Sequence, residues 1–550
     1  MDSTRAILAV ALCFLVFIIW SFYFTPKPQK PAPPAKPEVA PARPEAAITP
    51  PPAVLPEAKP DLSRPPRRIE VRNGVLNLVF TEEGARLVSC QLVKFREKLQ
   101  ADSPPKELVK IGETSLAPLG LTLVQGKIVG LEEARFEALT GEDLLSAKDQ
   151  EVSLAFRFVY PQGVEVIKRF LIRPESYLIG LEVELHNRSG QEIDDNLGLI
   201  LNARHEPHEG GRGGGFKGFG GYVSGKLHQE EVKKLKEPKV FFGKVSWGGY
   251  ENTYFLQAIV PEDKEGGLRA SLLDATKDNE LVSVRYVSPP FALGPGQSGL
   301  FKFNLFFGPK EIGLLKSLGH DLETSINMGW FDIVAKPFLY FLKFIYGYLH
   351  NYGLAIIVLT VLIKIAFWPL TQKSFKSMQA MQKLQPLMAK LREKYKDDRQ
   401  RLNQEMMNLY RSHKINPMGG CLPMLVQLPV FYALYRLLSD AIELRHAPFW
   451  LWINDLSAPD RLFSFDVRVP MMEPPYGIPV LTLLMGVSMF IQQKMTPTVG
   501  DPAQAKIMLM MPVIFTFVFI NFPSGLVLYW LVNNLLSIGQ QALINRSQRA

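Results

Sequence analysis

The sequence predicts a helical membrane protein with a large β-sheet domain between its first and second membrane-spanning segments. Three observations lead to this prediction. Apolar runs long enough to cross a bilayer occur at residues 6–24 and again beyond residue 348. Between them, residues 69–309 repeatedly alternate apolar and polar side chains with a period of two. A proline-rich tract separates the first apolar run from the alternating region.

The first apolar run, Ala6–Phe24, follows Arg5 and is longer than the apolar part of a typical signal peptide. No small-x-small cleavage pattern precedes the proline tract, so we interpret residues 1–25 as an uncleaved anchor rather than a signal peptide. Residues 26–66 combine many prolines with Ala, Lys and Glu, a composition that favours extended polyproline II structure. We expect this linker to hold the next domain away from the membrane.

Alternating side chains predict strands throughout residues 67–310. Leu181, Val183 and Leu185 alternate with glutamates, as in a strand that buries one face. Because no long helical pattern separates the alternating runs, we predict a large antiparallel β-sandwich. The same alternation recurs at residues 152–158 and 301–305.

The apolar run at residues 351–370 contains a single charge, Lys364, between two isoleucines. A lysine at the centre of a bilayer costs roughly 2.5–3.5 kcal/mol on insertion scales. One interpretation is that its long side chain reaches the membrane surface. The other is a water-filled cavity, which Thr360 and Trp368 favour because residues four apart share a helical face with Lys364. A charge inside the membrane indicates a functional site by default.

The remaining apolar segments predict that the chain crosses the membrane six times. The connection at 372–417 carries 11 Lys and Arg against 4 Asp and Glu, whereas the connection at 441–477 carries 3 against 5. By the positive-inside rule, the first connection is cytoplasmic and the second lies outside. Both termini and the connection at 496–506 then lie inside, with a short tail at 544–550. The spans after the anchor are residues 350–371, 418–440, 478–495, 507–522 and 524–543.

An aromatic segment at 322–349 precedes the Lys364 span. Asp332, Lys336 and Lys343 fall on one helical face of this segment, which favours an amphipathic helix lying in the membrane interface. The alternative is a helix that docks on the β-sandwich.

The basic connection 372–417 is predicted to be a helical hairpin with an internal apolar seam. Its apolar residues recur at steps of three and four, and Asp397-Asp398 interrupts the pattern. Met381, Met388 and Met406 have flexible thioethers that adapt to varied apolar partners, so they are candidates for capturing a substrate. Met381 and Met388 are equally well spaced to fill the seam of the hairpin itself.

Polar side chains inside the predicted spans are few. Gln427 lies in the 418–440 span, and Tyr529 and Asn533 share one face of the last span. They either form ordinary interhelical hydrogen bonds or line a polar cavity with Lys364. The spans lack the paired acidic residues of a proton relay and any repeated half, which makes a channel or transporter the weakest alternative.

No pattern in the sequence indicates catalysis, a cofactor or a metal ion. Gly213, Gly215 and Gly218 match a dinucleotide-binding pattern, but we expect no helix after them. The histidines of the segment 205–209 are one residue too close for a zincin motif, and Pro207 excludes a helix interior. The 3 cysteines fit no zinc spacing and no disulfide framework. The net charge of +9 is better explained by the cytoplasmic hairpin than by nucleic-acid binding.

Several motifs resemble those of the YidC family of bacterial membrane protein insertases. The resemblance is close from Gly329 onward and looser around Trp247 and Tyr254-Phe255. It implies a five-helix bundle with a hydrophilic groove that is open to the cytoplasm and lipid but closed toward the outside. It also implies a periplasmic β-supersandwich similar to sugar mutarotases. The motifs are Gly329-Trp330, Trp368-Pro369-Leu370-Thr371, Asn416-Pro417-Met418-Gly419-Gly420-Cys421, Leu444-Arg445-His446-Ala447-Pro448-Phe449 and Phe522-Pro523-Ser524-Gly525-Leu526-Val527-Leu528-Tyr529.

The resemblance assigns the cation of the groove to Lys364, where relatives usually carry arginine. Lysine keeps the charge but lacks the planar fork of arginine. Lys364 would attract the acidic or polar outer segment of a nascent integral membrane protein, while Thr360, Gln427, Tyr529 and Asn533 solvate it. Apolar burial would then drive insertion without nucleotide hydrolysis.

The partners implied by the resemblance are nascent membrane proteins, the lipid bilayer and the Sec translocon, with the ribosome or signal recognition machinery as further candidates. The implied location is the bacterial inner membrane, with both termini cytoplasmic and the β domain periplasmic. The alternative from another class is a membrane-tethered periplasmic carbohydrate-binding or sugar-modifying protein.

Overall fold

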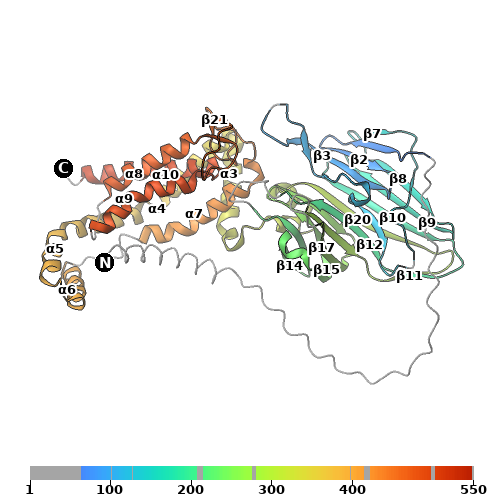
Figure 1. Ribbon diagram of the computed structural model, residues 1–550, viewed down its shortest axis with the longest axis horizontal. Coiled ribbons are helices and arrows are strands. Elements are labelled where there is room, and N and C mark those ends of the chain that lie inside the picture. The colour runs from blue at the N-terminus through green and yellow to red at the C-terminus, as the bar shows by residue number, and fades with distance from the viewer. Residues whose placement is uncertain are drawn as a thin grey trace, which may run out of the picture.

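The computed structural model describes residues 64–100, 102–126, 128–206, 215–274, 280–396, 398–413, 422–496 and 502–547. Within these residues a β-rich domain is followed by a helical region, and the two lie end to end along the long axis (Figure 1). The predicted anchor, most of the proline-rich linker and the motif at 416–421 lie outside the described residues.

Two large sheets and the two-stranded pair of β11 (Ile193–Asp195) with β19 (Phe291–Leu293) build the described part of the β-rich domain. The smaller runs in the order β4 (Pro105–Glu107), β3 (Arg86–Arg96), β2 (Leu76–Thr81), β1 (Arg68–Arg72) and β7 (Leu144–Ser146). The larger runs in the order β5 (Gly120–Leu123), β12 (Leu197–Arg204), β18 (Leu281–Val287), β17 (Glu265–Asp274), β15 (Lys239–Glu251), β16 (Phe255–Pro261), β20 (Ser298–Pro309), β10 (Leu178–Asn187), β9 (Val164–Ile172), β8 (Val152–Val159) and β6 (Glu137–Ala138). Strand β15 also pairs with β13 (Gly218–Val223), which pairs with β14 (Lys226–Glu231).

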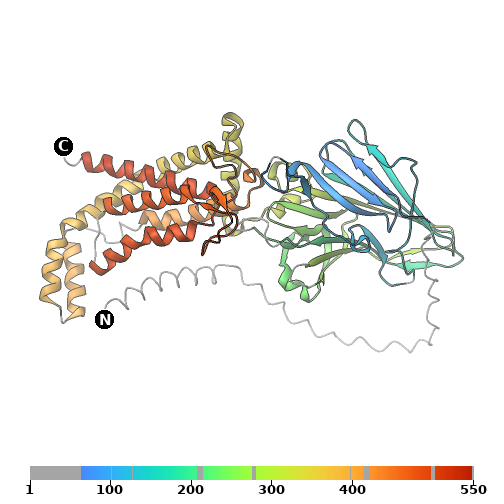
Figure 2. The same cartoon turned by 45° about the horizontal axis from the view of Figure 1, so that its top comes forward.

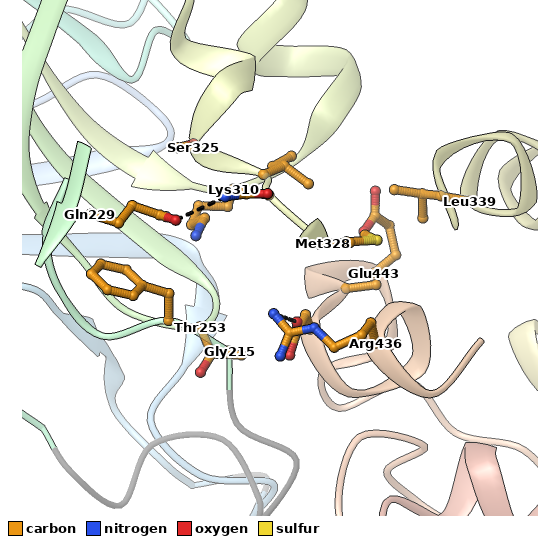
Figure 3. A pocket seen from close by; sticks show the side chains of 14 residues that line it. Gly215, Gln229, Thr253, Lys310, Ser325, Met328, Leu339, Arg436 and Glu443 are labelled. Atoms are coloured by element: carbon orange, nitrogen blue, oxygen red, sulfur yellow. Dashed lines mark hydrogen bonds and ion pairs between the residues drawn. The ribbon is translucent and has the colours of Figure 1, made fainter. Parts of the chain in front are cut away.

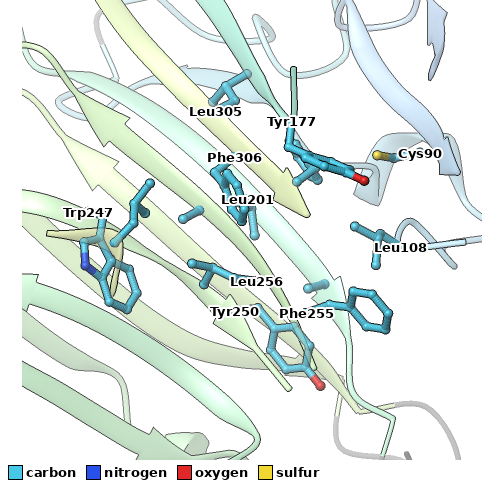
Figure 4. Close-up of a cluster of buried hydrophobic side chains, with 14 of the residues drawn as sticks. Cys90, Leu108, Tyr177, Leu201, Trp247, Tyr250, Phe255, Leu256, Leu305 and Phe306 are labelled. Carbon is cyan, nitrogen blue, oxygen red and sulfur yellow. The ribbon is translucent and has the colours of Figure 1, made fainter. Parts of the chain in front are cut away.

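The strands predicted from alternation are confirmed as β8, β10 and β20. Leu181, Val183 and Leu185 all point into the core, and β10 pairs antiparallel with both β9 and β20. One pairing differs from the expected antiparallel pattern, because β1 runs parallel to β7. Side chains of both sheets meet in a shared apolar core that includes Cys90 and Phe255 (Figure 4).

The helical region begins after a short α2 (Ile312–Leu318). Its long helices run side by side, with the α5–α6 hairpin at the end far from the sheets (Figure 2). Helix α10 packs against α4, α7 and α8, and α8 packs against α9. The helices are α3 (Asp332–Leu349), α4 (Tyr352–Lys383), α5 (Gln385–Lys394), α6 (Arg399–Ser412), α7 (Leu422–Asp440), α8 (Val480–Met495), α9 (Pro502–Phe519) and α10 (Ser524–Ser547).

Helix α4 is longer than the sequence predicted. We expected a span that ends at residue 371, but α4 is 32 residues long, ends at Lys383 and has Pro369 in its interior. Proline is tolerated inside membrane helices where other groups compensate for the lost backbone hydrogen bond. Near the proline, Thr371 Oγ1 donates to the carbonyl of Phe367 over 2.9 Å, whereas the carbonyl that loses its helical donor at Pro369 is that of Ile365. The Lys364 span and the start of the predicted hairpin are therefore one helix.

The lengths of the helices bear on the predicted spans. Among the described residues, α4 is the helix whose length and hydropathy both suffice to cross a membrane, whereas the apolar helical segments Val480–Met495 and Ile507–Phe519 are shorter. Helices α8 and α9 nevertheless expose many large apolar side chains, an unusual surface for a protein bathed in water. These side chains are Leu483, Leu484, Val487, Phe490, Ile491, Met508, Leu509, Met510, Val513, Ile514, Phe517 and Val518.

Helix α3 lies at the end of the helical region that faces the sheets (Figure 1). It packs against α4 and α7, and its opposite side exposes Ile333, Phe344 and Tyr348. Lys336 pairs with Asp332 within the helix over 2.8 Å. The alternative prediction was that this segment docks on the β-sandwich. Instead, α3 makes its main contacts with α4 and α7.

Candidate functional site

The side chain of Lys364 lies inside the helical region where α4, α7 and α10 meet. Its Nζ donates to Ser537 Oγ over 2.6 Å and to Asn533 Oδ1 over 3.4 Å. The amide of Gln427 donates to the same Asn533 oxygen over 3.4 Å. Lys364 is half-buried and both of its acceptors are neutral, so its positive charge is available to attract an anionic group.

The other two residues predicted for this site, Tyr529 and Thr360, lie close by, but their hydroxyls do not bind Lys364. Tyr529 is buried on α10, and its hydroxyl lies near the Gln427 amide without reaching hydrogen-bonding geometry. Thr360 is buried one turn before Lys364 on α4, and its hydroxyl donates to the carbonyl of Ile356 over 2.6 Å. Thr360 therefore satisfies its hydroxyl within its own helix.

Ser537 is the contact of Lys364 that the sequence analysis missed. It follows Asn533 by four residues, so it continues the same face of α10, and this spacing was the available signal. The Ser537 hydroxyl donates to the carbonyl of Asn533 over 2.7 Å, which leaves its oxygen lone pairs free to accept from Lys364. A second side of α10 is also polar, because Asn534 donates to Ser488 on α8 over 3.0 Å.

The predicted capture methionines occupy the α5–α6 hairpin and the end of α4. Met381 and Met388 are buried together with Leu384 and Tyr410, and the Tyr410 hydroxyl lies 3.6 Å from Met388 Sδ. Met406 is half-buried against the same cluster. Met381 and Met388 thus fill the seam of the hairpin, as the alternative interpretation of their spacing expected. Other apolar side chains of the hairpin, Leu387 and Met407, are exposed.

A separate cavity lies between the β-rich domain and the helical region (Figure 3). It encloses about 430 Å³ of empty space, part of it open to solvent. Its walls carry ionic pairs: Arg436 binds Asp440 over 2.9 Å, and Lys310 binds the buried Glu251 over 2.8 Å. None of the residues predicted for the groove lines this cavity.

The structure describes only part of the weak patterns of the β-rich domain. Strand β13, rather than a helix, follows the glycine pattern at residues 213–218. His205 binds the Tyr250 hydroxyl over 3.1 Å, while residues 207–214 lie outside the described part. Within the described residues, no three His, Cys, Asp or Glu side chains are grouped as metal ligands would be.

Exposed apolar helices around an interior lysine and amide cluster define an integral membrane protein with a polar site inside its helical region. The family model described as YidC periplasmic domain matches residues 68–341, and that described as 60Kd inner membrane protein matches residues 344–550. The membrane protein insertase YidC of Syntrophobacter fumaroxidans is 43% identical over 98% of this chain and 99% of its own length. The corresponding insertase of Geotalea uraniireducens is 41% identical over 99% of each chain. This chain belongs to the YidC family of membrane protein insertases.

Solved structures give weaker matches. The crystal structure of an active YidC insertase with its first transmembrane domain resolved is 20% identical and covers 88% of this chain and 94% of its own, with a TM-score of 0.37. A galactose mutarotase-like protein from Lactobacillus casei is 10% identical and covers 44% of this chain and all of its own, with a TM-score of 0.33. Because both TM-scores are below 0.5, the family assignment rests on the sequence relatives.

Proposed function

We propose that this chain inserts nascent membrane proteins into the bacterial inner membrane through a polar groove centred on Lys364. The observation that carries the proposal is the meeting of Lys364, Gln427 and Asn533 from three helices inside an apolar helical region. Membership in a family of membrane protein insertases supports the activity. The contacts around Lys364 favour the cavity over the interpretation in which its side chain reaches the membrane surface.

In the proposed topology, α4, α7, α8, α9 and α10 cross the membrane together with the N-terminal anchor. Both termini and the α5–α6 hairpin are cytoplasmic, and the β-rich domain is periplasmic. Three features support this arrangement: the exposed apolar sides of α8 and α9, the excess of Lys and Arg at 372–417, and the exposed aromatic side of α3, which suits a membrane interface.

The groove acts on the polar end of the substrate. Lys364 attracts an acidic or polar outer segment, since opposite charges interact more strongly in a site that is partly withdrawn from water. Asn533, Ser537 and Gln427 offer hydrogen bonds that replace part of the hydration of that segment. Tyr529 and Thr360 complete the lining. The apolar helix of the substrate leaves water for lipid along the helices, which supplies the driving force without nucleotide hydrolysis.

The hairpin receives the substrate before the groove does. Met406 and the exposed Leu387 and Met407 supply adaptable apolar contacts, while Met381 and Met388 keep the hairpin folded. Cooperation with the Sec translocon and delivery by the ribosome or signal recognition machinery belong to the same proposal.

The test is insertion of a small single-span protein with an acidic outer tail into liposomes that contain the purified chain. Protection of the tail from added protease reports insertion. We expect Lys364→Ala to lower insertion severalfold and Lys364→Arg to preserve most of it, because the attraction depends on charge. A substrate whose acidic residues are replaced by Ser is the matched control and should respond much less to Lys364→Ala.

Two results contradict the proposal at different points. Equal insertion by wild type and Lys364→Ala would remove Lys364 from the mechanism and keep the insertase. No insertion above empty liposomes would reject the insertase and favour the tethered carbohydrate-binding alternative, which sugar binding by the same preparation would then test.

A further inference from the structure

Three places at the end of the helical region that faces the β-rich domain expose apolar side chains on a left-handed backbone. Leu451, Phe463 and Met471 have φ angles of 59°, 53° and 64° and are 86%, 73% and 65% exposed. We propose that these places insert into the lipid bilayer around this end of the helical region. The inference rests on the proposed function, because it uses the membrane orientation proposed there. We call the three places the outer tips: residues 450–453, 462–465 and 469–472.

The first outer tip is a tight turn with Leu451 at its apex. The N–H of Ile453 donates to the carbonyl of Trp450 over 3.2 Å, which makes Leu451 the first central residue of the turn. Turns with a positive φ at this position are dominated by Gly, Asn and Asp. The Trp452 indole donates to the buried Asp460, which also accepts from an N–H in the first turn of α8. The base of the turn is thus anchored, while its apolar apex is uncovered.

The second outer tip is a β-bulge. Strand β21 (Leu462–Phe465) pairs antiparallel with β22 (Tyr476–Ile478). The register shifts between Leu462 and Ser464, so Phe463 is the extra residue on its strand. A bulge residue with a left-handed backbone is usually glycine. Here the position holds a phenylalanine whose side chain is exposed.

The third outer tip is the turn at 469–472, which the N–H of Met472 closes by donating to the carbonyl of Val469 over 3.2 Å. Pro470 and Met471 are its two central residues. Proline first and a positive φ second are typical of a type II turn, whose second central residue is usually Gly or Asn. The base is again anchored, since the carbonyl of Met471 accepts from the buried Asn521 over 2.7 Å.

The backbone at each outer tip would be less strained with glycine. A Cβ crowds the backbone at these φ angles, and glycine avoids the crowding. Water also favours polar side chains at exposed positions over Leu, Phe and Met. The described residues leave most of the surface of the three side chains uncovered, so packing within the fold does not offset the strain. A partner outside the chain does offset it, because such a partner removes apolar surface from water.

The surroundings of the outer tips point to lipid as that partner. Strand β21 and helix α3 lie at the same end of the helical region (Figure 1), where α3 exposes Ile333, Phe344 and Tyr348. Exposed apolar surface also continues along the chain from Ile478 to Leu483 in α8. The outer tips thus extend the apolar surfaces that the proposed orientation already assigns to the membrane.

The length of α8 gives the outer tips a purpose. Its 16 residues span about 24 Å at ~1.5 Å per residue, less than a hydrocarbon core of about 30 Å. A span shorter than the core strains the bilayer around it. Apolar tips beside the start of α8 reduce this mismatch. Asp466 and Arg468 are exposed between the second and third tips, so the insertion is shallow and leaves both charges at the lipid headgroups.

The experiment measures the surroundings of each tip by fluorescence quenching in proteoliposomes that contain the full chain. A bimane label is attached to a cysteine that replaces one tip residue, in a chain that carries Cys13→Ser and Cys421→Ser. Cys90 is fully buried and is left in place. Two quenchers are compared: lipids with a nitroxide near the headgroup end of the acyl chain, and iodide on both sides of the membrane. The variants are Leu451→Cys, Phe463→Cys and Met471→Cys.

We expect the nitroxide lipids to quench all three tip labels severalfold more than a control label, and iodide to quench them severalfold less. Leu144→Cys is the matched control. Leu144 is also an exposed apolar residue, but it lies in β7, far from the helical region (Figure 1).

The outcomes separate this inference from the proposed function. Iodide quenching equal to that of Leu144→Cys at two or more tips would overturn the inference. Labels that are protected from iodide but not quenched by the nitroxide lipids would also overturn it, and would indicate a protein partner or a second copy of this chain. If one variant does not fold, the other two decide the question. Absence of insertion by the wild type in the same vesicles would reject the proposed function and leave the quenching comparison valid.

Discussion

At the scale of single residues, Lys168 in β9 is a fully buried cation whose hydrogen-bond partners are backbone carbonyls. Its Nζ donates to the carbonyls of Gly84, Ala85 and Leu119 over 2.9, 2.6 and 2.6 Å. All three residues have positive φ angles, of 63°, 46° and 73°, which Ala and Leu rarely adopt. Burial and the nearby Arg86 lower the pKa of Lys168, but three acceptors favour the ammonium because it alone supplies three donors. The ammonium thus holds two strained turns together.

Lys168→Met should destabilise the β-rich domain strongly, because it leaves three buried carbonyls without their donor. We expect a loss of about 3 kcal/mol or more in the free energy of unfolding. Urea titration of the purified full chain measures the effect. Lys302→Met is the control, since Lys302 is exposed and pairs with Glu182 at the surface over 3.1 Å, a contact worth about 1 kcal/mol or less. Equal losses in both variants would contradict the role of Lys168.

The sequence predicted the roles of some of these residues and missed others. Lys364 was found because a charge in an apolar run is conspicuous, and Gln427 and Asn533 because polar residues are rare in such runs. Lys168 was missed because a lysine in a strand is expected to be exposed, although its spacing from Val166 and Phe170 places it on the buried face of β9, where carbonyls from distant turns accept from it. Long-range backbone partners of this kind leave no local signal.

At the scale of elements, the α5–α6 hairpin has a buried seam and an exposed apolar surface with different roles. Tyr410 and Met388 pack inside, whereas Leu387 is 42% exposed and Met407 is 46% exposed. The seam stabilises the hairpin, and the exposed side chains are free to contact a partner.

Replacing Leu387 and Met407 together by Ser should lower insertion severalfold, because the double variant removes exposed apolar contacts for an emerging chain. Stability should change by less than about 0.5 kcal/mol, as expected for surface substitutions. The protease-protection assay and thermal unfolding check the two expectations. Gln400→Ser with Gln404→Ser alters two exposed polar side chains of α6 and serves as the control. Equal insertion by both double variants would show that the hairpin surface does not contact the substrate.

The sequence predicted the strands well and the helix ends less well. Alternation located β8, β10 and β20 because each strand buries one face. The span with Lys364 was predicted to end at residue 371, yet α4 continues to Lys383. The short parallel pairing of β1 with β7 also had no signal in either strand.

At the scale of the whole molecule, the β-rich domain and the helical region are joined by contacts at one end. Arg445 donates to the carbonyl of Arg96 over 2.8 Å and lies over the Phe255 ring at 5.4 Å from its centre. Lys343 on α3 binds Glu311 over 2.7 Å, just after the last strand of the larger sheet. These contacts lie away from Lys364 and its partners, which belong to the helical region alone.

Deletion of residues 67–310 should therefore leave most of the insertion activity intact. Every side chain proposed for the groove is retained, and the lost contacts are those of the junction with the sheets. The protease-protection assay compares the deletion variant with the full chain. Loss of insertion, with the helices still folded by circular dichroism, would contradict the expectation and favour a function located in the β-rich domain.

The unbroken α4 has a mechanical consequence. Its 32 residues span about 48 Å at ~1.5 Å per residue, from the end near the sheets to the hairpin. Such a rod transmits force: a pull on the hairpin tilts the segment that bears Lys364. Pro369 lies between the two, where one rung of the hydrogen-bonded ladder is missing, so bending concentrates there. Helix α4 is thus a lever with its joint just beyond Lys364, and under the proposed function a chain that binds the hairpin would change the tilt of the segment that carries this charge.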